Sequence, residues 1–329
     1  MAEPRGRDAA SGHEESAGAS RPHLPASGLR SQRRPRSASG FGGPSAPRLV
    51  GDLFEEPRRL SGGASVQSGP TRGSRFPPRP CRSLRPDASL GGVTVEDRVP
   101  TGIQGFDRLV GGGFPRGTVN LLSGPAGSGK SLFGLHFAYN GAALFGENSM
   151  VVVLEETRRS LERAMASYGM EVGPYEREGR FLLVDIGELR TDEPERVVGF
   201  DEIRGFLDAA LPRSGARRLV LDSLSAIGLY YGSAEQLRER MFSFTRFLRA
   251  RDVTTLLITE SEEGAGLTRF GLEQFLADSF IYLGLEEIKG DLRRTLTVRK
   301  MRFTRHDAAK HPVHVTSAGL VVLDQEKVM

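Results

Sequence analysis

Residues 124–131, GPAGSGKS, fit the spacing G-x-x-x-x-G-K-[ST], in which glycines, a lysine and a hydroxyl recur at fixed positions. Such glycines let backbone N–H groups converge on an anion at the start of a helix. The lysine brings a positive charge to terminal phosphates, and the hydroxyl is a ligand for Mg²⁺. An apolar segment precedes the motif and a helix-forming run follows it. The motif therefore predicts a site for ATP with Mg²⁺, but alone it indicates binding and not catalysis.

Two groups of acidic residues follow other apolar runs. Asp222 ends RRLVLD, where a carboxylate can join Ser131 in holding Mg²⁺, or can simply cap a helix. Glu155 and Glu156 follow SMVVVL. If that strand lies beside the one preceding the motif, one of these glutamates could orient or deprotonate an attacking water. The alternative is that they are helix-start acids favoured by the dipole. We expect Lys130, Glu155 and Glu156 to be the catalytic groups.

A pair of cations lies far along the chain, at Lys300 and Arg302. Residues two apart point to the same face of a strand, so these two could clamp the charge that builds on a transferring phosphate. Lysine and arginine on an edge strand also commonly prevent sheet-to-sheet aggregation. Spacing alone leaves the two interpretations open.

The elements that must position these residues alternate between strands and helices. Continuous apolar strands separated by helices predict an α/β fold with a mainly parallel twisted sheet covered on both faces. After residue 275 the pattern contains only strands, which we expect to add antiparallel strands at one edge. The predicted strands are 118–123, 149–156, 180–186, 217–223 and 253–259, and the predicted helices are 129–145, 157–169, 198–211 and 234–250.

The first 93 residues differ from the rest in composition. They are rich in Gly, Ser, Pro, Ala and Arg without periodicity, which predicts a disordered tail ahead of one domain at 94–325. Residues 1–90 contain 15 Arg, no Lys and 8 acidic residues, which leaves 30 basic and 33 acidic residues for 91–329. The tail could contact nucleic acid or an acidic partner, or could have no specific role. The domain itself is not a basic nucleic-acid platform.

The cysteine content and the lengths of the apolar runs exclude further classes of protein. The single cysteine, Cys81, excludes a disulfide framework or a cysteine zinc site within one chain and fits a reducing compartment. No apolar run approaches the roughly 18 residues of a membrane span. We therefore expect a cytoplasmic protein without a membrane contact.

The segment TGIQGFDRLVGGGFPRGTVNLLSGPAGSGKSLFGLHFAYNGA (101–142) resembles the entry to a KaiC-type ATPase domain of the RecA superfamily. The resemblance continues through VVVLEETRRSLERAMASYG, RRLVLDSLSAI, TTLLITESEE and RFGLEQFLADSFIYL and closes with TLTVRKMRFTRHDAAKHPV. It covers nearly all of 95–325 and none of the tail. It implies a RecA-like core that binds ATP and Mg²⁺ and assembles as a homo-oligomeric ring, usually a hexamer, with ATP at the subunit interfaces.

The resemblance also implies which residues contact the nucleotide. One subunit supplies the phosphate-binding loop, the glutamate pair and Asp222, and the neighbouring subunit supplies a Lys-x-Arg strand and a following histidine. The implied nucleotide contacts are Gly124, Pro125, Ala126, Gly127, Ser128, Gly129, Lys130, Ser131, Leu132, Ser167, Asp222, Lys300, Met301, Arg302, Thr304, His306 and Thr316.

Departures from the family pattern narrow the function. The clock protein of this family has two such domains in tandem, and this chain has one. Its adjacent Ser-Thr autophosphorylation pair is replaced by Gln274 and Phe275, so we do not expect an autokinase cycle, and Ser317 stands where the family often has Asp. We expect an Mg-dependent ATPase that signals through a partner protein. A DNA-binding recombination-type ATPase is less favoured because the loop 261–267 is acidic, and a nucleotide-dependent scaffold with little turnover is a third alternative.

Overall fold

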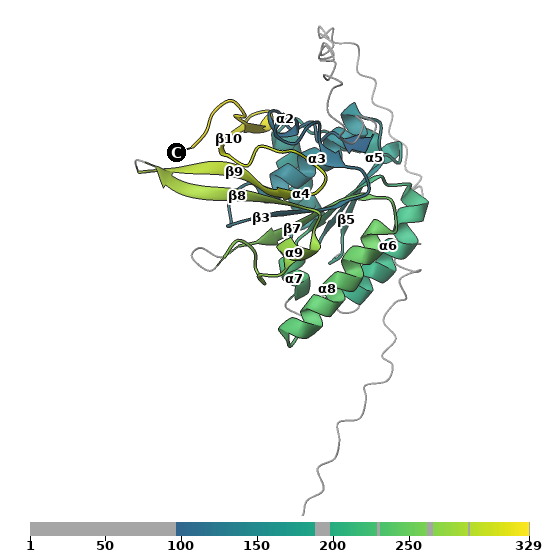
Figure 1. Cartoon of the computed structure of the whole chain (residues 1–329). Coiled ribbons are helices and arrows are strands. Elements are labelled where there is room, and N and C mark those ends of the chain that lie inside the picture. Colours follow the sequence, from purple (N-terminus) through teal and green to yellow (C-terminus); the bar gives the residue numbers. More distant parts are fainter. Residues whose placement is uncertain (1–96, 188–197, 229–230, 262–265, 289, 329) are drawn as a thin grey trace, which may run out of the picture. The chain divides into compact units, whose positions relative to one another are not determined.

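Within the described residues, nine strands form one continuous sheet with helices on both faces (Figure 1). The computed structural model describes residues 97–187, 198–228, 231–261, 266–288 and 290–328. The predicted tail at 1–93 lies outside the described residues, as do residues 262–265 of the acidic loop. The strands are β1 (Arg98–Val99), β2 (Phe114–Pro115), β3 (Val119–Gly124), β4 (Ser149–Val153), β5 (Phe181–Asp185), β6 (Arg218–Asp222), β7 (Thr254–Glu260), β8 (Ser279–Ile288), β9 (Asp291–Met301), β10 (Lys310–Thr316) and β11 (Gly319–Val322).

The helices begin and end close to the predicted positions. Thr157 caps α4 by accepting a hydrogen bond from the Ser160 amide, and Ser233 caps α8 in the same way through the Gln236 amide. In the described residues the helices are α2 (Phe106–Leu109), α3 (Lys130–Leu144), α4 (Arg158–Ser167), α5 (Gly173–Arg177), α6 (Phe200–Ser214), α7 (Leu224–Gly228), α8 (Ala234–Arg249) and α9 (Glu273–Leu276).

The large sheet has the order β11-β10-β9-β8-β3-β7-β6-β4-β5. The six strands from β8 to β5 are parallel, and β9, β10 and β11 continue the sheet in antiparallel fashion. The α/β class is thus confirmed. The prediction that every strand after 275 is antiparallel is wrong for β8, which pairs in parallel with β3. The chain passes from β7 to β8 through α9, and such a crossover returns the next strand in the same direction.

The strand order does not meet the condition under which the glutamate pair was expected to reach the loop. The strand predicted at 149–156 forms β4, which ends at Val153, and it does not lie beside β3 because β7 and β6 lie between them. Apolar runs of similar composition do not encode which strands become neighbours. The reach of Glu155 and Glu156 toward the loop must therefore have another geometric basis.

Two apolar layers cover the sheet. One contains Phe106, Phe114, Phe133 and Phe137, whose rings meet edge to face or tilted, and it packs under α2, α3 and α4. The other lies under α6, α7 and α8 on the opposite face. Figure 1 shows α3 and α4 on one side of the sheet and α6 and α8 on the other. Burial on both faces explains why the central strands are apolar throughout.

The helix that follows the loop lies unusually close to the sheet. A Cβ atom at Gly134 of α3 would lie 3.0 Å from Val220 of β6 and 2.9 Å from Ile258 of β7. Near its other end, α3 is tied to β6 by the buried Arg218, which donates to the Phe137 carbonyl at 3.0 Å and to Glu147 at 2.7 Å. These contacts fix α3 over β6, the pair of elements that carries Ser131 and Asp222.

Candidate nucleotide-binding site

The predicted phosphate-binding loop connects β3 to α3, as its motif requires. Gly127 and Gly129 have φ angles of 78° and 102°, in the left-handed region that favours glycine. A Cβ at Gly124 would lie 2.1 Å from the Leu283 carbonyl oxygen of β8. Each glycine of the motif thus has its own steric reason, and the loop forms a concave turn at the start of a fifteen-residue helix.

Two polar side chains of the loop have surroundings that suit an anionic ligand. The Ser128 hydroxyl is buried and has no hydrogen-bond partner among the described residues. The Lys130 ammonium is also buried and donates across the loop to the Pro125 carbonyl at 2.9 Å. Buried polar groups are normally satisfied, so these two suit a phosphate ligand that accepts hydrogen bonds.

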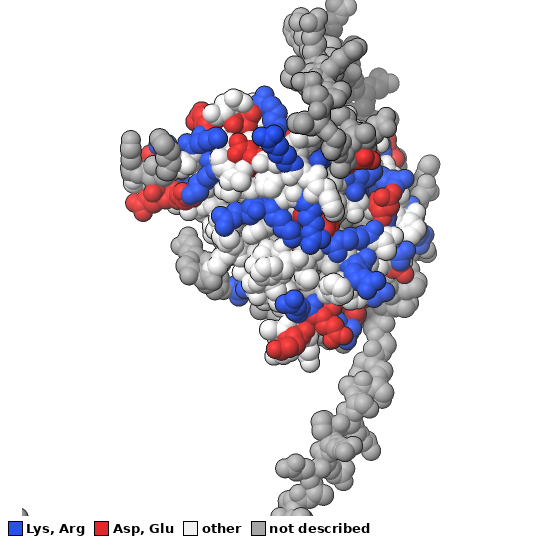
Figure 2. Space-filling view, in the orientation of Figure 1, with Lys and Arg blue, Asp and Glu red and all other residues white. Residues whose placement is uncertain are grey.

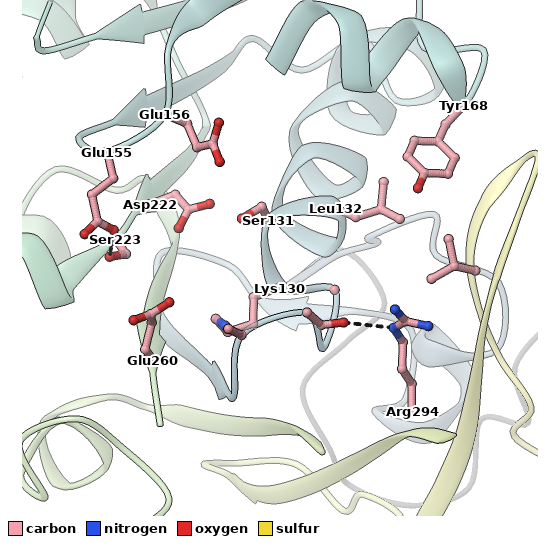
Figure 3. A pocket seen from close by; sticks show the side chains of 14 residues that line it. Lys130, Ser131, Leu132, Glu155, Glu156, Tyr168, Asp222, Ser223, Glu260 and Arg294 are labelled. Atoms are coloured by element: carbon pink, nitrogen blue, oxygen red, sulfur yellow. Dashed lines mark hydrogen bonds between the residues drawn. The ribbon is translucent and has the colours of Figure 1, made fainter. Parts of the chain in front are cut away.

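A pocket of about 380 Å³ opens beside the loop (Figure 3). Asp222 at the end of β6 points toward Ser131 at the start of α3, with Lys130 below them in that view. The residues lining it are Ala126, Gly127, Gly129, Lys130, Ser131, Leu132, Glu155, Glu156, Tyr168, Asp222, Ser223, Glu260, Arg294 and Val315. The pocket therefore gathers the loop, the predicted glutamates and the predicted metal ligands.

The glutamate pair reaches this pocket through β6. The Leu154 amide donates to the Asp222 carbonyl at 2.9 Å, so the chain beyond β4 continues beside the end of β6. The Ser223 hydroxyl then donates to Oε2 of Glu155 at 2.8 Å. Glu156 follows directly and lines the same pocket. The structure thus brings both glutamates to the loop even though their strand is not its neighbour.

The pocket is acidic. Glu155, Glu156, Asp222 and Glu260 line it, against the two cations Lys130 and Arg294. Burial raises the pKa of Asp222, the charges of the two nearby glutamates raise it further, and a Ser131 hydrogen bond opposes the rise. This excess of negative charge, together with a hydroxyl beside a carboxylate, is the hard-oxygen donor set that Mg²⁺ prefers.

The Lys130 ammonium also responds to this environment. Burial lowers its pKa, and the carboxylates of Glu260, Asp222 and Glu155 oppose the effect. The Lys130 ammonium, which would meet the terminal phosphates, thus lies buried in the loop and close to three carboxylates. A bound phosphate would stabilise its charged form.

Sequence reasoning missed five lining residues as site residues: Tyr168, Ser223, Glu260, Arg294 and Val315. Glu260 ends an apolar strand as Asp222 does, so the same signal could have found it. Arg294 on β9 donates to the Gly127 carbonyl at 3.0 Å, but its neighbour Arg293 carries the same side chain and no local pattern separates the two. Tyr168 immediately follows the predicted Ser167, and Val315 immediately precedes the predicted Thr316. Those two predictions were therefore one residue away from the lining positions.

Several predicted contacts do not line this pocket. The Ser167 hydroxyl donates to the Ala164 carbonyl at 2.7 Å, and Thr316 donates to the Gly319 carbonyl at 3.1 Å. Met301 is buried, and the Thr304 hydroxyl donates to the Arg302 carbonyl at 3.2 Å. Lys300, Arg302 and His306 are also absent from the lining, as are the loop residues Gly124, Pro125 and Ser128.

The predicted cation pair lies at the other end of the sheet. Strand β9 runs antiparallel to β8, so Met301 pairs with Ser279, and Ser279 in turn pairs with Asn120 at the start of β3. The phosphate-binding loop follows Gly124 at the end of β3. A strand rises about 3.3 Å per residue, so roughly 13 Å of β3 separates the two levels. Lys300 and Arg302 therefore lie near the edge opposite the loop.

The two cations contact neighbouring residues of the segment that precedes β8. The Lys300 ammonium donates to the Ala277 carbonyl at 2.7 Å, and Nη1 of Arg302 donates to Oδ1 of Asp278 at 3.2 Å. Arg302 lies one residue beyond the end of β9, so only Lys300 is part of the strand.

None of the helices in the described residues combines the length and apolar composition needed to span a bilayer.

Comparisons with known proteins identify relatives of this chain. The family described as "ATPase: KaiC" matches residues 99–327. A UPF0273 protein of Thermotoga maritima is 35% identical over 240 residues, which cover 70% of this chain and 97% of that protein. A UPF0273 protein of Pyrococcus horikoshii is 36% identical and is covered to 93%.

Two further relatives carry KaiC in their names. The circadian clock oscillator protein KaiC of Synechococcus elongatus is 31% identical over 228 residues, which span 68% of this chain and 43% of that protein. The crystal structure of a KaiC-like protein from Pyrococcus horikoshii superposes with a TM-score of 0.61 at 38% identity and covers 68% of this chain and 98% of that one.

Proposed function

Because the chain belongs to the KaiC family of RecA-superfamily P-loop ATPases, we propose that it hydrolyses ATP in sites shared between neighbouring copies of a ring, taken as a hexamer. The observation that carries this proposal is the placement of the two half-sites. The loop and its acids lie at the carboxyl ends of the parallel strands, and Lys300 and Arg302 lie near the amino ends. The two lie apart within one copy, so a second copy would supply the cations.

The first half-site would bind the nucleotide and activate the attacking water. The loop amides and Lys130 would hold the phosphates, and Ser131 with Asp222 would hold Mg²⁺. When bound, Mg²⁺ neutralises charge on the phosphate oxygens. Glu155 or Glu156 would accept the proton of the attacking water, because both carboxylates line the pocket.

The outer end of the same pocket suits the nucleoside. Figure 3 shows Leu132, Tyr168 and Arg294 on the side of the loop away from Glu155. An aromatic ring and a guanidinium both stack well on a purine. We place the base here, next to the predicted contacts Ser167 and Thr316.

The second half-site would complete catalysis from the neighbour. An acidic pocket and a cationic pair on opposite edges are complementary when copies repeat head to tail. Cations directed at the γ-phosphate would stabilise the charge that develops there during transfer, as an arginine finger does. Thr304 and His306 follow Arg302 and would approach the same nucleotide. We propose that turnover changes the conformation of the ring and that a partner protein reads this change.

The test combines the mass of the assembly in solution with the rate of ATP turnover. Light scattering of the full chain with and without Mg·ATP should show assembly, and turnover per copy should rise steeply with protein concentration. Lys300→Ala and Arg302→Ala should each lower kcat by about 10³-fold while the affinity for ATP stays nearly unchanged. Arg217→Ala is the matched control, because this exposed arginine pairs only with Asp252 among the described residues. Full turnover by a strict monomer would overturn the shared site.

A further inference from the structure

Asp278 occupies the junction at which three separate elements meet the predicted cation pair. It directly precedes β8, and its side chain is only 9% exposed. Its carboxylate accepts from the Val119 amide at 3.0 Å, from Nε of Arg249 on α8 at 3.0 Å, and from Arg302 at 3.2 Å. One buried carboxylate thus connects the first residue of β3, the end of α8 and the cation beyond β9.

The backbone of the same segment strengthens this connection. The Arg302 amide donates to the Asp278 carbonyl at 3.0 Å, and the Asp278 amide donates to the Val119 carbonyl at 2.7 Å. The Lys300 ammonium donates to the carbonyls of Ala277 and Gln274 at 2.7 and 3.1 Å. Both cations are therefore held against residues 274–278.

The cations keep donors available in this arrangement. The Arg302 side chain is 48% exposed and uses one nitrogen for Asp278, although a guanidinium carries five N–H donors. Lys300 uses two of its three donors. Figure 2 shows lysine and arginine side chains in a band across the face that carries the end of β9 and of α8. The contacts thus fix each cation and leave part of it facing outward.

We propose that Asp278 is a positioning residue that holds Arg302, and with it Lys300, in the orientation in which they reach the nucleotide of the neighbouring copy. This inference rests on the proposed intersubunit site. Long cationic side chains lose rotamer freedom when they bind, and fixing them beforehand removes that loss from the reaction. Arg249 and Val119 hold the carboxylate itself in place, so the orientation is set by the fold and not by the ligand.

The first test measures hydrogen exchange, without nucleotide, in the segment that carries Lys300 and Arg302. Hydrogen exchange of peptides covering residues 299–306 should be faster by about tenfold in Asp278→Asn, because a charged hydrogen-bond partner is lost. Peptides from β6 should be unchanged. Arg240→Gln is the matched control, since this arginine lies on α8 as Arg249 does but pairs with the exposed Asp201. Unchanged exchange at 299–306 would overturn the positioning role.

The second test assigns the defect to one half-site by mixing variants. Asp278→Asn alone should lower kcat by about 100-fold, the cost of a misplaced catalytic group, with little effect on binding of a fluorescent ATP analogue. Lys130→Ala copies lack a working loop but keep their cations. Mixed with them, Asp278→Asn copies should regain activity, whereas mixed with Arg302→Ala copies they should not.

The mixtures separate failure of this inference from failure of the proposed function. Arg302→Ala mixed with Lys130→Ala tests the shared site alone, and an inactive mixture would overturn that site. If that mixture is active but Asp278→Asn with Lys130→Ala is not, Asp278 acts on the loop half-site and the inference is wrong. Should Asp278→Asn fail to fold, Arg249→Gln decides: a smaller defect with the same complementation pattern supports the inference, and normal turnover or a loop-side defect overturns it.

Discussion

The Ser223 hydroxyl donates a 2.8 Å hydrogen bond to Oε2 of Glu155, so the residue next to Asp222 fixes one of the two candidate bases. Among the described residues, Glu156 has no such hydrogen-bond partner. A base must be held within reach of the proton that it removes. This contact favours Glu155 over Glu156 as the group that activates water.

Glu155→Gln is therefore expected to lower kcat by about 10²–10⁴-fold, the range for loss of a general base. Ser223→Ala frees the Glu155 side chain and should cause a smaller loss in the same direction. Steady-state ATPase assays on both variants and on Glu156→Gln give the comparison. Equal losses in the two Gln variants together with a normal Ser223→Ala enzyme would contradict the assignment.

Asp222→Asn should separate stability from function. Burial raises the pKa of Asp222, so its ionisation is less favourable in the folded chain than in the unfolded one. Such a group contributes stability below the unfolded pKa near 3.9 and loses it as pH rises through the higher folded pKa. At pH 7 the neutral amide should raise the free energy of unfolding of the ligand-free protein by about 0.5–2 kcal/mol.

Urea unfolding with and without Mg·ATP measures both effects of Asp222→Asn. The stabilisation that Mg·ATP gives to the wild type should be largely lost, because the proposed metal ligand is missing. The gain without ligand should disappear below pH 4. A variant that is less stable than the wild type without ligand, or that keeps the full Mg·ATP effect, would count against the assigned role.

His136 should make stability depend on pH. Burial lowers its pKa, and its Nε2 accepts a 3.3 Å hydrogen bond from the Leu320 amide, which requires the neutral ring. Between the lowered folded pKa and the unfolded value near 6.5, the unfolded chain binds the extra proton, so stability falls as pH drops through this window. The slope from this group cannot exceed about 1.4 kcal/mol per pH unit.

Urea unfolding at pH 7.5 and 5.5 checks this expectation. His136→Gln should remove part of the loss seen in the wild type, and His314→Gln, at an exposed position on β10, should not. If both variants follow the wild type, His136 does not contribute to the pH dependence.

Phe303 combines a φ of 59° with a side chain that is 78% exposed, directly after Arg302. A residue with a Cβ atom pays about 1–2 kcal/mol for left-handed backbone, which glycine avoids. Phe303→Gly should therefore raise the free energy of unfolding by about 1 kcal/mol. Phe303→Ala is the matched control, because it removes the ring but keeps the Cβ atom and should give no such gain. Chemical denaturation of both variants measures this difference in the free energy of unfolding.

The local parts of the fold and site were predictable, and the long-range parts were not. The residues of the loop lie within eight positions, so spacing alone identified Lys130 and Ser131. Glu155 reaches the loop only because β4 pairs with β6, and the apolar runs do not record that pairing. Arg294 is selected by its register on β9, where a shift of one residue would have placed Arg293 over Gly127 instead.

The opposite placement of the two half-sites also restricts symmetry. In a two-fold interface each contact occurs twice, so an acidic pocket meets the partner's cations only when both half-sites lie within one self-complementary patch. Head-to-tail repetition joins unlike patches without this requirement, and every copy is then donor on one side and acceptor on the other. Such repetition ends in unused half-sites unless it closes on itself. For the proposed head-to-tail interface, closure into a ring lets every copy both give and receive its cations.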